Sequence, residues 1–172
     1  MNAVFYLSAI VAVVATVMVV TRVNAVHALL YFIVSLLSVA LIFFLLGAPL
    51  VAALEVIIYA GAIMVLFVFV IMLLNLGSEA AGKEKQLLSP QAWTGPALLA
   101  AVLLGELIYV LVKGGPGAGG IGIIGPKQVG ILLLTKYMIG VELASMLLLA
   151  GLVGAYHLGR RKEAGRERGE RS

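Results

Sequence analysis

Long apolar runs alternate with short polar segments along the whole chain. Five of the runs are long enough to form a helix of about 20 residues, which is the length needed to cross a hydrocarbon core about 30 Å thick. They cover residues 3–20, 26–46, 54–76, 92–112 and 138–157. The pattern therefore predicts an all-α integral membrane protein with five transmembrane helices, forming a single transmembrane domain over residues 1–157 and followed by a basic tail over residues 158–172.

The connections between the runs differ in length and composition. Residues 21–25 and 47–52 are so few that they predict tight turns, and the first three helices should then be sequential antiparallel neighbours. Residues 77–89 are polar and precede Pro90, whereas residues 114–125 are rich in glycine and predict a linker without regular structure.

Composition supports a membrane protein over a soluble one. The chain has 172 residues, of which 63% are hydrophobic and 12% are charged, and its mean hydropathy is +1.16. A soluble fold would lack the polar residues that a surface in contact with water requires. The absence of cysteine excludes disulfides and cysteine-ligated iron–sulfur clusters within this chain.

The distribution of lysine and arginine predicts the orientation. Half of the basic residues lie in the C-terminal tail, and a cytoplasmic tail also places Arg22, Lys83 and Lys85 in the cytoplasm when five helices alternate. We therefore expect the N-terminus outside and the C-terminus in the cytoplasm. The basic tail also favours contact with anionic membrane lipids, while its shortness and its interspersed glutamates do not favour nucleic acid.

Charged residues within apolar runs are informative because a charge in hydrocarbon costs about 3 kcal/mol or more unless it is paired or meets water. The candidates are Glu55, Glu106, Glu142 and Lys136. Glu55 is expected to open the third helix at its outer end, where it either favours the helix dipole or contributes to a proton path. Glu142 is expected one turn inside the fifth helix, too far from Lys136 for a direct pair on one helix. Glu106 lies deeper, so it is expected either to be protonated or to pair with a neighbour.

No motif predicts a catalytic centre or a metal site in this chain. Serine, histidine and aspartate sets, zinc motifs, phosphate loops and dinucleotide-binding fingerprints are all missing from the sequence. A haem held by His27 and His157 is the weaker interpretation, because histidines at helix ends are more typical of interfacial anchors or caps.

The third apolar run is the most distinctive segment. Residues 53–76 read ALEVIIYAGAIMVLFVFVIMLLNL, with Ala60, Gly61 and Ala62 beside Tyr59. Glycine lowers the cost of leaving regular helix geometry, so a π-bulge would be accommodated most easily between Tyr59 and Val65. The alternative is that the small residues only form a notch for close helix packing.

This segment resembles the signature helix of the J-subunit family of the proton-pumping NADH:quinone oxidoreductase, respiratory complex I, and is similar to the sixth mitochondrially encoded subunit. Two further segments support the resemblance: NAVHALLYF at residues 24–32 resembles the start of that family's second helix, and LLLTKYMIGVELASMLLLAGLVGA at 132–155 resembles its fifth. Gly140 and Val141 stand where the family often has Pro-Phe, so a sharp proline kink is not expected.

The resemblance implies a subunit that couples quinone reduction to proton pumping and has no catalytic centre of its own. FMN, iron–sulfur clusters and the quinone, ubiquinone or menaquinone, would belong to other subunits of the complex. The implied partners are membrane-arm subunits, including a small three-helix subunit and the quinone-site subunit, in the bacterial cytoplasmic (inner) membrane. Tyr59, Gly61 and Val65 would form a coupling hinge, and Glu55 and Glu142 would be candidates for a proton path.

Two other classes remain open at this point. One is a structural subunit of a related membrane hydrogenase or cation antiporter complex. The other is a small stand-alone permease, which would need a continuous polar pathway that this chain is too apolar to supply.

Overall fold

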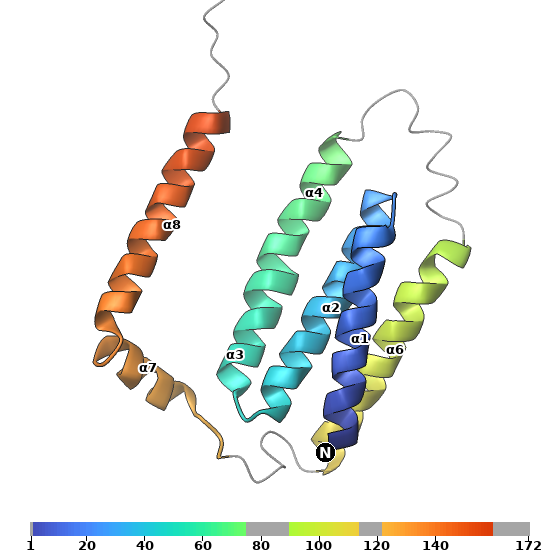
Figure 1. Ribbon diagram of the computed structural model, residues 1–172, viewed down its shortest axis with the longest axis horizontal. Coiled ribbons are helices and arrows are strands. Elements are labelled where there is room, and N and C mark those ends of the chain that lie inside the picture. Colours follow the sequence, from blue (N-terminus) through green and yellow to red (C-terminus); the bar gives the residue numbers. More distant parts are fainter. Residues whose placement is uncertain (1, 75–89, 114–121, 160–172) are drawn as a thin grey trace, which may run out of the picture. The chain divides into compact units, whose positions relative to one another are not determined.

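The computed structural model describes residues 2–74, 90–113 and 122–159, and these ranges contain helices joined by short turns (Figure 1). Five helical segments are long and apolar enough to cross a membrane: Ala3–Thr21, Ala25–Leu45, Pro49–Leu73, Trp93–Lys113 and Met138–Gly159. For the described ranges, the prediction of an all-α protein with five candidate spans is confirmed. The side of the membrane on which each terminus lies stays a prediction.

The chain divides into two compact units, Met1–Gly125 and Pro126–Ser172. The first unit holds four of the candidate spans and the second holds the last one. The polar loop expected at residues 77–89 and most of the basic tail lie outside the described residues, as do residues 114–121 of the glycine-rich linker.

Two helices joined by a short turn form the centre of the first unit. Helix α1 spans Asn2–Thr21 and packs along α2, Ala25–Leu45. The Asn24 side chain caps α2 by accepting hydrogen bonds from the backbone N–H groups of Val26 and His27. This cap gives a partner to two N–H groups at the start of the helix, where the helix itself supplies none.

Helix α6, Pro90–Lys113, packs against both α1 and α2. The three helices enclose an apolar core that includes Val11, Ala15, Leu41, Leu103 and Val110. Because lipid tails are as apolar as these side chains, close packing and hydrogen bonds between helices have to stabilise the bundle. One such bond joins Thr16 Oγ1 of α1 to Ser35 Oγ of α2 over 2.8 Å.

The third candidate span is built from three segments. Helix α3, Pro49–Leu54, leads into a π-helix, η1, Glu55–Ile63, which continues as α4, Met64–Leu74. All three contact α2, as expected for sequential neighbours.

This span begins at Pro49, so the expected turn over residues 47–52 is wrong in its length. Gly47 adopts a φ of 79°, which closes the end of α2 abruptly, and the N–H groups of Gly47 and Ala48 bond to carbonyls of the last turn of α2. Proline suits the first turn of the next helix, where its missing N–H has no partner to lose.

The second unit contains a short helix that the sequence analysis did not assign. Helix α7, Pro126–Leu134, is joined by a three-residue turn to α8, Met138–Gly159. Within the turn the Tyr137 N–H bonds to the Leu132 carbonyl over 2.9 Å, and the Thr135 hydroxyl donates to the Ile131 carbonyl over 2.6 Å. The Ile131 carbonyl also accepts the backbone N–H of Thr135 over 3.0 Å, so both carbonyls at the end of α7 have partners.

Candidate functional site

The π-helix η1 places two of the three expected hinge residues in non-standard helix geometry. Tyr59 and Gly61 lie within Glu55–Ile63, and Val65 is the second residue of the α-helix that follows. At the boundary, the Met64 N–H bonds to the Tyr59 carbonyl, five residues earlier, and to the Gly61 carbonyl. The i to i−5 bond is the defining bond of a π-helix and marks one extra residue in the turn.

Gly61 is the position at which this geometry depends on the absence of a side chain. A Cβ atom at residue 61 would lie 3.2 Å from the carbonyl oxygen of Val56, which is also five residues earlier. Such a contact is tighter than ordinary van der Waals packing, so a larger residue would push the Val56 carbonyl away. Glycine therefore permits the close backbone approach inside η1.

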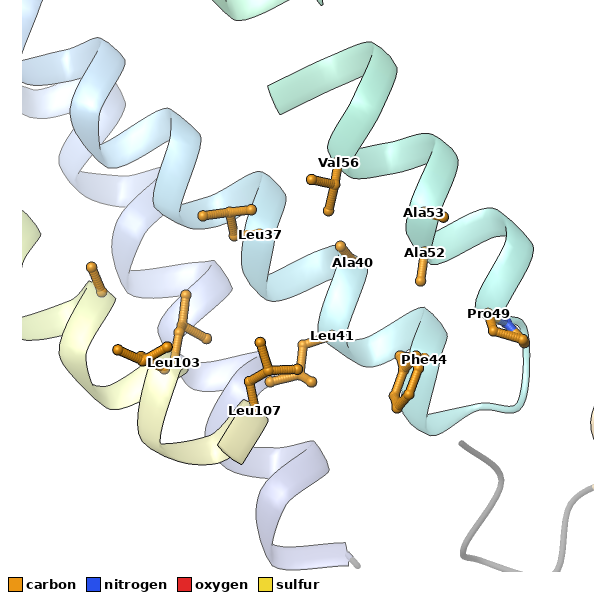
Figure 2. A pocket seen from close by; sticks show the side chains of 12 residues that line it. Leu37, Ala40, Leu41, Phe44, Pro49, Ala52, Ala53, Val56, Leu103 and Leu107 are labelled. Carbon is orange, nitrogen blue, oxygen red and sulfur yellow. The ribbon is translucent and has the colours of Figure 1, made fainter. Parts of the chain in front are cut away.

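An apolar cavity of about 530 Å³ lies between α2, α3, η1 and α6 (Figure 2). The figure shows Ala52 and Val56 on one side, Leu37 and Leu41 of α2 between, and Leu103 and Leu107 of α6 on the other side. Its lining side chains carry no polar group, and a cavity of that kind offers nothing to which water can hydrogen-bond. The π-helical segment thus forms part of the wall of an apolar, partly open space within the first unit.

Glu55 occupies the junction between α3 and η1. Its expected place at the opening of the third helix is wrong, because α3 supplies six residues before it. The backbone N–H of Glu55 already bonds to carbonyls of Val51 and Ala52, so this residue is not in the first turn of the span. The first turn of a helix has unpaired N–H groups that attract a carboxylate, but Glu55 does not lie there. The helix-dipole explanation for Glu55 is therefore not supported.

Glu142 and Lys136 belong to the second unit. Glu142 is the fifth residue of α8, as expected, and its backbone carbonyl accepts a hydrogen bond from Ser145 Oγ over 2.7 Å. Lys136 lies in the turn before α8, with Nζ 5.8 Å from the ring centroid of Tyr137. The ammonium group thus lies over an aromatic face.

The two histidines also fall in different units. His27 follows the cap of α2, and its buried Nε2 has no hydrogen-bond partner within the described residues. His157 lies in the last turn of α8. Among the described residues, no group of three or more histidine, cysteine, aspartate or glutamate side chains gathers as a metal site would require.

Glu106 has a partner that sequence reasoning missed. A hydrogen-bond contact joins its Oε2 to Ser8 Oγ of α1, and both residues are buried. The two positions are 98 residues apart, and no local pattern connects them. The only available signal was that each is a polar residue inside an apolar run.

The similarity to known proteins covers most of the chain. A family described as NADH-ubiquinone/plastoquinone oxidoreductase chain 6 matches residues 15–158. The NADH-quinone oxidoreductase subunit J of Pseudomonas aeruginosa is 58% identical over 157 residues, which are 91% of this chain and 95% of the relative. The chain belongs to the J-subunit family of NADH-quinone oxidoreductase.

Subunits J of other bacteria are also similar to this chain. The subunit J of Escherichia coli K12 is 52% identical over 94% of this chain and 88% of its own length, and that of Rhodobacter capsulatus is 36% identical over 88% and 77%. The chain is therefore a subunit of the membrane arm of NADH-quinone oxidoreductase. Of the three classes considered from the sequence, the hydrogenase or antiporter subunit and the stand-alone permease give way to this one.

Proposed function

We propose that this J-family subunit couples quinone reduction in its complex to proton translocation through a two-state third span. The observation that carries the proposal is the π-helix Glu55–Ile63, which interrupts an otherwise regular transmembrane helix. A π-helix is rare and occurs frequently at functional sites. Tyr59, Gly61 and Val65 form the coupling hinge, and Glu55 and Glu142 contribute to the proton path.

The two states differ in the rotation of α4. Removing one residue from a π-helical turn rotates the following helix by about 100°, the angle that one residue subtends in an α-helix. The side chains of Val65 and Leu66 in α4 then face a different direction. A path lined by these side chains is dry in one state and open to water in the other.

The cavity beside η1 supports this arrangement. Val56 belongs both to the π-helix and to the cavity wall, and its carbonyl is the group that Gly61 approaches. A change of η1 to regular helix therefore moves a residue of the wall. Packed interiors tend to switch between discrete arrangements rather than deform gradually, which suits a gate.

The wider setting is part of the same proposal. The N-terminus lies outside and the C-terminal tail lies in the cytoplasm of a bacterium, with the subunit in the cytoplasmic membrane and in contact with its lipids. Its neighbours are membrane-arm subunits, including a small three-helix subunit and the quinone-site subunit. FMN, iron–sulfur clusters and quinone are held by other chains, and nucleic acid has no role.

Replacing Gly61 by alanine and by valine tests the hinge. Each side chain crowds the Val56 carbonyl in the π-helical state, and valine does so more because it is branched at Cβ. Overpacking of this kind costs about 1–3 kcal/mol, which changes the ratio of two states by about 5- to 150-fold. In complex purified in mild detergent, quinone-linked turnover and proton pumping should fall together, more for valine than for alanine.

Two controls make the result specific. NADH oxidation by an artificial electron acceptor should stay near normal, because the hinge holds no redox group. Gly105→Ala in α6 should have no effect, since a Cβ there meets nothing within 4 Å in the structure. If both Gly61 variants assemble with the flavin and iron–sulfur subunits and pump at the wild-type rate, the hinge proposal is wrong.

A further inference from the structure

Glu106 is the most enclosed carboxyl group among the described residues. Its side chain is 5% exposed and that of Ser8 is 0% exposed, and both lie inside candidate membrane spans. Oε2 of Glu106 contacts Ser8 Oγ, while Oε1 is buried without a hydrogen-bond partner in the described ranges. An ionised carboxylate in this position would keep one charged oxygen unsatisfied in an apolar environment, which is costly.

The number of hydrogens that Ser8 can donate indicates the protonation state of Glu106. A serine hydroxyl has one hydrogen to donate. Ser8 Oγ lies 2.9 Å from the carbonyl oxygen of Val4 and also contacts Glu106 Oε2, so an ionised Glu106 would leave two acceptors competing for one hydrogen. If Glu106 carries a proton, its O–H donates to Ser8 Oγ and the Ser8 hydroxyl donates to Val4. Both contacts then have a hydrogen.

We propose that Glu106 is a proton-binding site in the interface between α1 and α6, occupied in this state and emptied and refilled during quinone-linked turnover. That Glu106 holds a proton in this state is inferred from its contacts. That it releases and rebinds the proton during the reaction rests on the proposed function in proton translocation. On release, the O–H bond of Glu106 breaks and the proton passes to a water molecule. On return, a protonated water supplies it again. No electron moves in either step.

The cavity described above offers the route for that water. Leu103 and Leu107 of α6 line it, and Leu103 is about 60° around the helix from Glu106, given about 100° per residue. Leu103 also belongs to the buried core that α1, α2 and α6 enclose. A rearrangement of η1 that admits water to the cavity would bring that water to α6, the helix that carries Glu106.

No titratable side chain of the helices packed against α6 takes the place of the proton as a partner of Glu106 within the described residues. The helices that pack against α6 are α1 and α2, whose titratable side chains, together with that of Arg22 after α1, are Tyr6, His27 and Tyr31. Tyr6 is 64% exposed. Arg22, His27 and Tyr31 lie at the other end of the bundle, where the Arg22 guanidinium carbon is 5.5 Å from the Tyr31 ring centroid.

Infrared difference spectroscopy of the assembled complex tests the inference. The carbonyl stretch of a neutral carboxylic acid should be present in the wild type, respond to reduction by NADH, and disappear in Glu106→Gln. Ser8→Ala should shift the same band, because it removes the acceptor of the acid's hydrogen bond. This second variant keeps the test usable if Glu106→Gln does not assemble.

Proton pumping gives an independent readout. Glutamine can still hydrogen-bond to Ser8 but cannot exchange a proton, so Glu106→Gln should pump fewer protons per NADH oxidised, and Glu106→Asp should recover part of the loss. Thr16→Ala is the matched control, since it removes a hydrogen bond between helices without removing a titratable group. It should pump normally.

The outcomes separate this proposal from the hinge. An unchanged carbonyl region in Glu106→Gln and Ser8→Ala would show that Glu106 is ionised and would overturn the proposal. A band that is present but does not respond to turnover, with normal pumping, would show a fixed acid and overturn it as well. A normal Gly61→Val variant would instead contradict the hinge and leave the infrared result on Glu106 unaffected.

Discussion

The three glutamates of the candidate spans have different surroundings, and these differences predict how each tolerates loss of its charge. Glu106 is enclosed and contacts a hydroxyl, Glu55 is partly exposed at a junction of helix types, and Glu142 lies in the second turn of α8. Water replaces a missing polar group more easily near a helix end than in the middle of a span. The distance of each glutamate from the end of its helix should therefore decide how strongly its replacement lowers proton pumping.

Glu55→Gln should reduce proton pumping more than Glu142→Gln, and neither should abolish it. Glu55 lies about 9 Å from the start of its span, since six residues of α3 precede it at about 1.5 Å each. Glu142 is closer to the end of its helix, where water can complete a proton path. Pumping by the assembled variants, divided by NADH oxidation with an artificial acceptor, measures the difference. The reverse order would contradict the assignment by depth.

At the scale of elements, α2 is the common neighbour on which the first unit is built. It contacts α1, the three segments of the third span, and α6. It lies very close to α6 at Gly95, where an added Cβ would lie 2.0 Å from the hydroxyl oxygen of Tyr31 and 3.1 Å from its ring. Tyr31 is buried, so its phenol has little room to move aside.

Gly95→Ala should loosen the packing of α6 against α2 at a cost of about 1–3 kcal/mol, the usual range for overpacking. Tyr31→Phe removes the atom that clashes first, so the double variant should recover part of the lost stability. Thermal unfolding of the purified complex, followed by release of this subunit, provides the measurement. Equal stability of Gly95→Ala and wild type would mean that α6 does not approach α2 as closely as the structure has it.

At the scale of the whole molecule, orientation sets which side of the membrane each part of the proposed path faces. The predicted arrangement rests on the positive charge of the tail and on the alternation of five spans. The five spans belong to two units. Whether the N-terminus and the tail lie on opposite sides of the membrane therefore depends on the number of crossings between them.

A reporter fused after Arg161 should be active only in the cytoplasm, and one inserted at Gly117 should be active only outside. An odd number of crossings separates the two termini, and the positive-inside rule assigns the basic tail to the cytoplasm. Alkaline phosphatase and green fluorescent protein fusions, which report opposite sides, give the measurement. An external reporter after Arg161 would contradict either the number of crossings or the orientation.

The sequence by itself determined the five spans, their approximate bounds and the family. The length of an apolar run and the bonds of a helix in hydrocarbon are local properties, so each span could be predicted without knowledge of its neighbours. The residues around Gly61 also carried a local signal, since glycine beside other small residues favours departure from regular helix. The position of Val65 outside η1 was not predicted, nor was the early start at Pro49, which depends on how Gly47 closes α2.

Only the tertiary structure decided which polar residues meet. Ser8 and Glu106 are 98 residues apart, and Thr16 and Ser35 join different helices, so each contact depends on how helices pack and rotate against one another. The rotation of a helix is set by the sum of many small side-chain contacts, and no single position along the sequence reports that sum. The cavity beside Val56 has the same origin, because its wall comes from α2, α3, η1 and α6 together.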